Sequence, residues 1–344
     1  MVQRVVEVLP HETFAPLPQP PGAPPYRLEL SEVGTDPLDT LAFHVIGDSG
    51  GIFDAMPQKA VVAALVADLA ANGSDFIFHV GDVVYFNGDH GSYFPQFYEA
   101  YDPYARPILA IPGNHDGDNG DNPSVPSLDA FVENFCASQP VPTPDADDAH
   151  RDAMTQPNVY WTLRAALVTI IGLYSNVPSG GEINPDQIAW LVGELEAAPT
   201  DRPVIVALHH PPFSADAHHG GSQRMGDLLD AAFAKSRWPN MVLSGHVHNY
   251  QSFERVVNGV TIPYLVIGSG GYHNLHGMAK QNGVPLVLPW AVPNVQGLTL
   301  RAADDKHYGF LRLEINSKAI SGVYYGTDRN GSSAVALDHF SYAS

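Results

Sequence analysis

The stretch Pro203-Val204-Ile205-Val206-Ala207-Leu208-His209 is a short apolar run, rich in β-branched residues, that ends in histidine. A second run, Asn240-Met241-Val242-Leu243, leads in the same way into Ser244-Gly245-His246-Val247-His248. Runs of this length and composition predict two strands of one buried sheet. A single histidine at a strand end is usually structural, but three at neighbouring strand ends favour a metal site.

Upstream, three more apolar runs end in glycine followed by a polar residue, at residues 41–48, 75–82 and 106–114. Helices are expected between these runs, at residues 57–71 and 93–101. Strands that alternate with helices and carry polar residues at their carboxyl ends are typical of α/β architecture. Ligand sites in such sheets lie outside those ends.

Residues 117–157 interrupt the alternation, because they are rich in Asp, Pro and Gly and contain one short helical stretch at 128–135. We expect them to form a surface excursion beside the site. Further strands are expected at 159–163, 166–173, 250–257, 262–267, 309–315 and 320–325, and further helices at 184–197 and 224–234. The last strands alternate like antiparallel strands that close a second sheet. The expected fold is therefore α/β, in the form of an α+β sandwich: two mixed β-sheets packed face to face and flanked by helices.

The expected domain organisation is an extended, Pro-rich N-terminal arm at residues 1–40 and a single domain at 41–344, which includes the excursion at about 117–157. The one cysteine, Cys136, excludes an internal disulfide and a thiolate metal cage. The N-terminus lacks the basic and apolar regions of a signal peptide. The cytoplasm is therefore the default compartment, although a trimmed export signal is compatible with this sequence.

The acidic balance of the chain limits its partners. Its 17 basic and 37 acidic residues give a formal charge of −20, which argues against binding to nucleic acid or to an anionic membrane. No apolar run reaches the roughly 18 residues of a membrane span. A small phosphate ester stays compatible with this charge, because bound cations can reverse the local field. The sequence leaves the oligomeric state open.

The polar residues at the expected strand ends form one set: Asp48, Asp82, Tyr85, Asn114, His209, His246 and His248. Seven side chains are too many for one metal ion and suit two ions that share a bridging ligand. Each residue alone has a simpler interpretation, since Gly-Asp and Gly-Asn are common turns. Their joint occurrence at five strand ends favours a binuclear site.

Five blocks carry these residues: Gly47-Asp48-Ser49-Gly50, Gly81-Asp82-Val83-Val84-Tyr85, Gly113-Asn114-His115-Asp116, Val206-Ala207-Leu208-His209 and Gly245-His246-Val247-His248. Their order resembles the signature of the calcineurin-like metallophosphoesterases. The Gly-Asp-x-x-Tyr block is similar to the purple acid phosphatase branch, whose cousins place a histidine where Gly50 stands here. The resemblance implies a four-layer metallophosphoesterase sandwich and a phosphoric monoester hydrolase of the acid phosphatase type.

The resemblance also implies how the ligands are shared. One metal ion is held by Asp48, Asp82, Tyr85 and His248, and the other by Asp82, Asn114, His209 and His246, with Asp82 bridging. The first set has two carboxylates and a phenolate, hard anionic donors that suit Fe³⁺. The second has an amide, two imidazoles and the shared carboxylate, which suit Zn²⁺, Mn²⁺ or Fe²⁺.

Three further histidines are expected to be catalytic. In the family, the position of His115 contacts the substrate phosphate or the leaving group, and a His-His pair similar to His218 and His219 follows the histidine corresponding to His209. Of this pair, His219 is the preferred candidate. His44, His79 and His210 are expected to be structural, whereas His273 and His276 are expected at the rim of the site.

The expected function is hydrolysis of phosphate monoesters by two metal ions. A metal-activated hydroxide would attack phosphorus, and His115 or His219 would help the leaving oxygen depart. No motif for a protein nucleophile is found. Two alternatives stay open: a phosphodiesterase or nucleotide hydrolase that uses the same metals, and an inactive metal-binding interaction module.

Overall fold

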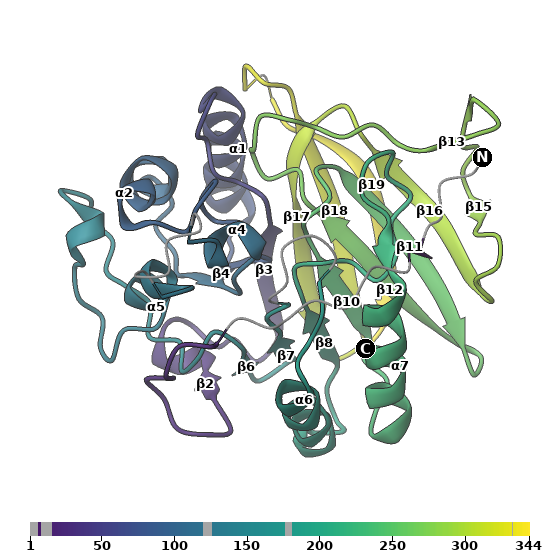
Figure 1. The fold of residues 1–344 in the computed structure, drawn as a ribbon, viewed down its shortest axis with the longest axis horizontal. Helices are drawn as coiled ribbons and strands as arrows, with labels where there is room; N and C mark the ends of the chain where they lie inside the picture. Colours follow the sequence, from purple (N-terminus) through teal and green to yellow (C-terminus); the bar gives the residue numbers. More distant parts are fainter. Residues whose placement is uncertain (1–5, 8–15, 120–125, 176–180, 332) are drawn as a thin grey trace.

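The computed structural model describes residues 6–7, 16–119, 126–175, 181–331 and 333–344. Two β-sheets pack face to face, with helices on both outer sides (Figure 1). The first sheet has six strands in the order β19-β18-β17-β3-β4-β5. Their bounds are β3 Thr40–Ile46, β4 Phe76–His79, β5 Ile108–Ala110, β17 Tyr308–Asn316, β18 Ala319–Thr327 and β19 Val335–Ala343. β3, β4 and β5 are parallel, so their carboxyl ends meet at one edge.

The second sheet has nine strands in the order β15-β16-β11-β12-β10-β8-β7-β6-β2. Their bounds are β2 Arg27–Glu29, β6 Trp161–Arg164, β7 Thr169–Gly172, β8 Val204–Ala207, β10 Met241–Ser244, β11 Tyr250–Val257, β12 Val260–Ile267, β15 Trp290–Ala291 and β16 Leu298–Asp304. β8 and β10 are adjacent and parallel, as the two histidine-bearing runs predict. Two small pairs complete the strands: β1 Val6–Glu7 with β9 Gly221–Ser222, and β13 Lys280–Gln281 with β14 Val284–Pro285.

The helices form the outer layers (Figure 1). They are α1 Met56–Asn72, α2 His90–Tyr93, α3 Glu99–Tyr101, α4 Asn114–Gly117, α5 Asp129–Phe135, α6 Pro185–Ala197 and α7 Gln223–Lys235, with a π-helical turn at Phe94–Tyr98 and 3₁₀ turns at Leu30–Glu32 and Pro144–Ala146. The side chain of Asn184 caps α6 by accepting a 2.8 Å hydrogen bond from the Gln187 amide. Within the described residues, no helix is long and apolar enough to cross a membrane.

Strand alternation explains the layers, because successive side chains point to opposite faces of a sheet. From β3, Phe43 and Val45 enter the core between the two sheets, whereas Ile46 packs toward α1. From β8, Ile205 enters the central core and Val206 packs with α6 and α7. The central strands are buried on both faces, which is why their sequences are continuous apolar runs. The expected fold class is confirmed.

The structure corrects two details of the sequence interpretation and adds one to a third. Residues 27–29 are not part of a separate arm, since β2 pairs with β6 at the edge of the second sheet. The C-terminal strands β17, β18 and β19 extend the sheet that contains β3 rather than closing a second one. The excursion at 117–157 is anchored, because Phe131 and Phe135 are fully buried against the helical layer. Residues 1–5 and 8–15 of the arm and 120–125 of the excursion lie outside the described residues.

Candidate metal centre

All seven side chains singled out at strand ends come together between the carboxyl edges of the two sheets. The first sheet supplies Asp48 after β3, Asp82 and Tyr85 after β4, and Asn114 at the start of α4. The second sheet supplies His209 after β8, and His246 and His248 after β10. The arrangement of these strands brings together residues far apart in the chain: the His246 amide, for example, donates to Asp48 Oδ2 at 2.8 Å across 198 positions.

Three donor atoms form a closed triangle. The Tyr85 hydroxyl lies 3.3 Å from Asp48 Oδ1 and 3.4 Å from His248 Nε2. His248 Nε2 in turn lies 3.6 Å from Asp48 Oδ1. Asp48 and Tyr85 are completely or almost completely buried, so this group is shielded from water.

A second group surrounds Asp82. His209 Nε2 lies 3.2 Å from Asp82 Oδ2, and His246 Nδ1 lies 3.0 Å from Asn114 Oδ1. Donor atoms of Asp82, His209 and His246 all lie within 4.8 Å of one another. Asn114 and His246 are only half-buried, so the centre opens to solvent on this side.

These separations are also those expected between the ligands of a bound cation. Ligand atoms about 2.0–2.1 Å from a tetrahedral ion lie about 3.3 Å apart. His209 Nε2 lies 3.2 Å from Asp82 Oδ2 but is buried without a hydrogen-bond partner, as is His246 Nε2. A buried polar atom without a partner is costly, and a cation between these donors would satisfy it.

Main-chain contacts orient the histidine ligands. His209 Nδ1 donates to the Val80 carbonyl at 2.9 Å, and His248 Nδ1 donates to the Asn274 carbonyl at 2.9 Å. In both rings, Nε2 is therefore the nitrogen left to bind a metal ion, and it faces a carboxylate. Such outer hydrogen bonds fix the tautomer and orientation of metal-ligating histidines.

The backbone at the site is strained. Asp48, Asp82 and His246 adopt positive φ angles of 58°, 54° and 66°. Side-chain-bearing residues rarely occupy this region, and strain of this kind clusters at functional sites. Gly113 lies so close to Asp82 that a Cβ atom at this position would collide with its carboxylate.

The buried carboxyl groups of the site favour positive charge beside them. Burial raises the pKa of Asp48 well above its usual value, and the Asp82 charge adds to this effect despite the opposing charge of His209. Burial likewise raises the pKa of Asp82, but His209 and His115 outweigh it and hold that pKa below its usual value. Although burial lowers the pKa of His209, Asp82 and Asp48 raise it to about 9. The carboxylates thus hold a proton on His209 in a place where a metal cation could take over the positive charge.

The remaining ligand candidates are uncharged without a cation. Burial lowers the pKa of His248 to about 3 and that of His246 well below its usual value. Burial, followed by the charges of Asp48 and Asp82, raises the pKa of the Tyr85 phenol well above its usual value. Neutral imidazole is the form that binds metals, whereas Tyr85 would need a strongly charged cation to ionise.

Comparison with known proteins agrees with this geometry. The family model described as calcineurin-like phosphoesterase matches residues 41–250. The chain belongs to this family.

The relatives of this family member are purple acid phosphatases. It is 27% identical to Purple acid phosphatase 22 of Arabidopsis thaliana over 251 residues, which cover 69% of this chain but 51% of the plant protein. It therefore spans about half the length of that relative. It is 26% identical to Tartrate-resistant acid phosphatase type 5 of Mus musculus over 318 residues, covering 86% of this chain and 90% of the mouse protein.

The fold of this family member is also that of a solved purple acid phosphatase. Purple acid phosphatase PPD1 from yellow lupin (Lupinus luteus) aligns with a TM-score of 0.62 at 16% identity, covering 89% of this chain and 54% of the lupin chain. The expected resemblance to the calcineurin-like family and its purple acid phosphatase branch is thus confirmed.

Of the three histidines expected to be catalytic, two lie directly beside ligand candidates, His115 and His219. The His115 amide donates to Asp82 Oδ1 at 2.9 Å, and its Nδ1 donates to the Phe86 carbonyl at 2.8 Å. The exposed His219 ring lies 5.0 Å from the His246 ring. The His218 ring packs instead on His276, at 4.9 Å. The geometry therefore favours His219 over His218, as the sequence interpretation does.

Two carboxylates at the site were not assigned a role from sequence. Buried Asp116 accepts hydrogen bonds from the amides of Gly113 at 2.8 Å and Val83 at 3.0 Å, so it ties together the loops that carry Asn114 and Asp82. Burial, and then the Asp82 charge, raises the pKa of Asp116 to about 6. Asp216 accepts bonds from the amides of His218 and His219, both at 2.8 Å. The only sequence signal was that Asp116 ends the Gly-Asn-His-Asp block.

Two further rings lie beside the ligand candidates, the phenol of Tyr272 and the imidazole of His276. Tyr272 stacks on Tyr85 with ring centroids 4.1 Å apart, and the buried His276 ring lies 4.4 Å from His248. His44, His79 and His210 are buried and hydrogen-bonded to Asp68, Ser49 and Ser175 respectively.

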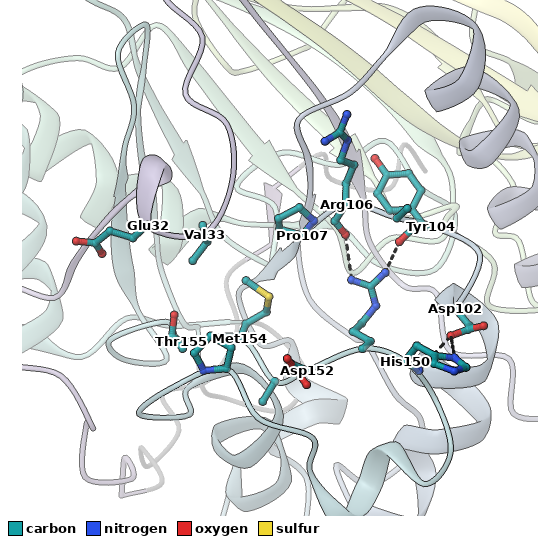
Figure 2. Close-up of a pocket in the computed structure, with 14 residues that line it drawn as sticks. Glu32, Val33, Asp102, Tyr104, Arg106, Pro107, His150, Asp152, Met154 and Thr155 are labelled. Atoms are coloured by element: carbon teal, nitrogen blue, oxygen red, sulfur yellow. Dashed lines mark hydrogen bonds and ion pairs between the residues drawn. The ribbon is translucent and has the colours of Figure 1, made fainter.

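A separate cavity of about 500 Å³ lies at the amino end of β5 (Figure 2), and none of its lining residues is a ligand candidate. Its lining includes acidic Glu32 and Asp152 together with basic Arg106 and Arg151. The Arg151 guanidinium donates to the carbonyls of Arg106, Tyr101 and Tyr104. This guanidinium thus holds the main chain in place, which is a structural role.

Proposed function

We propose that this protein is a binuclear metal-dependent hydrolase of phosphate monoesters, similar to acid phosphatases. The observation that carries the proposal is the convergence of seven donor side chains in two groups around Asp82, with the buried Nε2 atoms of His209 and His246 lacking hydrogen-bond partners. Membership of the calcineurin-like phosphoesterase family supports it.

In this proposal, Asp48, Tyr85 and His248 hold Fe³⁺, and Asn114, His209 and His246 hold Zn²⁺, Mn²⁺ or Fe²⁺, with Asp82 shared by both. Such a pair of cations would polarise the phosphoryl group and supply the nucleophile near neutral pH. The donor chemistry supports the division, because the first group contributes a phenol and the second an amide and two imidazoles.

The side chains at the open side would bind and protonate the substrate. Because His115 Nδ1 donates to the Phe86 carbonyl, its Nε2 is the atom left for a phosphoryl or leaving-group oxygen. His219, on the exposed side of His246, can give a proton to the departing oxygen. Asp216 positions it by accepting its amide hydrogen.

The test compares p-nitrophenyl phosphate with bis(p-nitrophenyl) phosphate, using metal-loaded protein across a range of pH. We expect about two metal ions per chain by elemental analysis and a higher kcat/KM for the monoester. His219→Ala should slow the monoester more than the diester, with a loss of about 10²–10⁴-fold if His219 is the general acid. His150→Ala is the matched control, since this side chain is 91% exposed and pairs with Asp102.

Each other outcome points to a different function. Faster turnover of the diester, or equal losses on both substrates in His219→Ala, would replace the proposal with a phosphodiesterase. Absence of turnover of either ester by metal-loaded protein would indicate a metal-binding interaction module.

A further inference from the structure

Three aromatic rings form the rim beside the candidate metal centre: Phe53, Phe86 and His273, here called the aromatic shelf. Phe53 lies in the loop between β3 and α1 and is 68% exposed. Its ring centroid is 5.2 Å from that of Phe86 and 5.3 Å from that of His273. Phe53 therefore joins two rings that come from different parts of the chain.

Both ends of the aromatic shelf lead into the site. The Phe86 ring lies 5.6 Å from the His115 ring, and Phe86 directly follows the candidate ligand Tyr85. The His273 ring lies 4.6 Å from Tyr272, which stacks on Tyr85. A group attached to a phosphate at the centre would thus meet the shelf as it leaves the site beside His115.

The shelf is held in place before any ligand binds. Asp54, next to Phe53, forms an ion pair with Arg329 at 2.6 Å. The Tyr308 hydroxyl donates to the His273 carbonyl at 2.8 Å. The first loop is therefore tied to the turn that follows β18, and the second to the start of β17, so a ligand would not have to order them on binding.

We propose that the aromatic shelf binds the leaving group of the substrate, and that the preferred substrates are aryl phosphate monoesters. The inference rests on the proposed function. A planar ring on the ester oxygen would cover the exposed Phe53 face and gain stacking energy, whereas a flexible alkyl group gains less from such a surface. In the reaction, water adds to phosphorus. The bond between phosphorus and the ester oxygen of the aryl group breaks, and that oxygen takes up a proton.

The experiment compares 1-naphthyl phosphate with n-butyl phosphate on the metal-loaded protein and on Phe53→Leu. Aryl esters are intrinsically more reactive, so the readout is the aryl-to-alkyl ratio of kcat/KM in the variant divided by that ratio in the wild type. Intrinsic reactivity cancels in this quotient. Leucine keeps an apolar side chain but removes the ring, and the exposure of Phe53 makes misfolding no concern. The ratio should fall roughly 2- to 10-fold, the range expected for one aromatic stacking contact.

Ile52→Ala is the matched control, because Ile52 lies in the same loop, is 38% exposed and has no ring to stack. Its ratio should equal that of the wild type. As a second measurement without mutation, phenylphosphonate should inhibit the wild type roughly 2- to 10-fold more strongly than methylphosphonate.

An unchanged ratio in Phe53→Leu, with both esters still hydrolysed, would overturn the proposed role of the shelf in leaving-group binding. It would not affect the proposed function. Equal losses of ratio in Ile52→Ala and Phe53→Leu would also overturn it, because the loop rather than the ring would then be responsible. A change in oligomeric state without a change in ratio would show that Phe53 belongs to a protein interface. Failure of the wild type to hydrolyse either ester would instead reject the proposed function.

Discussion

Gly113→Ala tests the geometry of the candidate metal centre without changing any ligand. The backbone of Gly113, with φ −93° and ψ −169°, is accessible to alanine, so the effect comes from contact alone. The added Cβ atom would lie 2.5 Å from the Asp82 nitrogen and 2.8 Å from Asp82 Cγ, where ordinary contact begins at 3.4 Å. Asp82 must therefore move by almost 1 Å, about the misplacement that can cost roughly 10²-fold in rate.

The assay measures three quantities: metal content per chain after gel filtration, kcat/KM with an aryl monoester, and the melting temperature without metal. We expect loss of bound metal, a fall in kcat/KM of about 10²-fold, and destabilisation by about 1–3 kcal/mol from overpacking. Gly193→Ala is the matched control, since no atom lies within 4 Å of a Cβ atom there. In the exposed interior of α6, this change should stabilise the protein by about 0.5–1 kcal/mol. Full metal content and normal kcat/KM in Gly113→Ala would refute the close approach of Gly113 to Asp82.

Three further predictions address metal identity, the bridge and acid stability. Tyr85→Phe should abolish visible absorption if the phenolate binds Fe³⁺; a colourless, active, iron-free wild type would contradict that assignment. Asp82→Asn should lose more metal than His248→Ala, because both ions would lose a shared charge; two ions per chain in Asp82→Asn would exclude bridging. Although burial raises the pKa of Asp68, hydrogen bonds from His44 and Asn72 lower it overall. Its contribution to stability is then present above about pH 4 and lost as pH falls through the lowered value. In Asp68→Asn, the melting temperature should therefore fall less steeply with decreasing pH in this acid range. A pH dependence equal to that of the wild type would contradict this role of Asp68.

The centre could be predicted from sequence because its side chains follow short, fully apolar runs. Such runs mark strands that are buried on both faces, and the residue after a strand lies at the carboxyl edge. Asp82 and His209 needed only that local pattern. Asp216 could not be found in this way, because its carboxylate acts through a loop that folds back onto Asn249. An acidic residue in such a segment looks like ordinary solvated surface.

Two of the strands that sequence analysis missed, β2 and β19, lack an apolar run. β2 contributes three residues, and its place in the sheet depends on main-chain pairing with β6. β19 is an edge strand whose side chains are exposed or half-buried throughout, so alternation of hydrophobicity is weak there. Pairing partners far away in sequence decide both strands, and a local pattern carries no information about them.

The two sheets contribute different chemistry to the centre. The sheet containing β3, β4 and β5 supplies the oxygen donors Asp48, Asp82, Tyr85 and Asn114, whereas the sheet containing β8 and β10 supplies the imidazoles of His209, His246 and His248. In the proposed arrangement, each ion takes ligands from both sheets, so neither sheet alone could hold either ion. The apolar core between the sheets, to which Phe43 and Ile205 contribute, therefore sets the separation between oxygen and nitrogen donors. Core packing and metal affinity should for this reason be coupled across the whole sandwich.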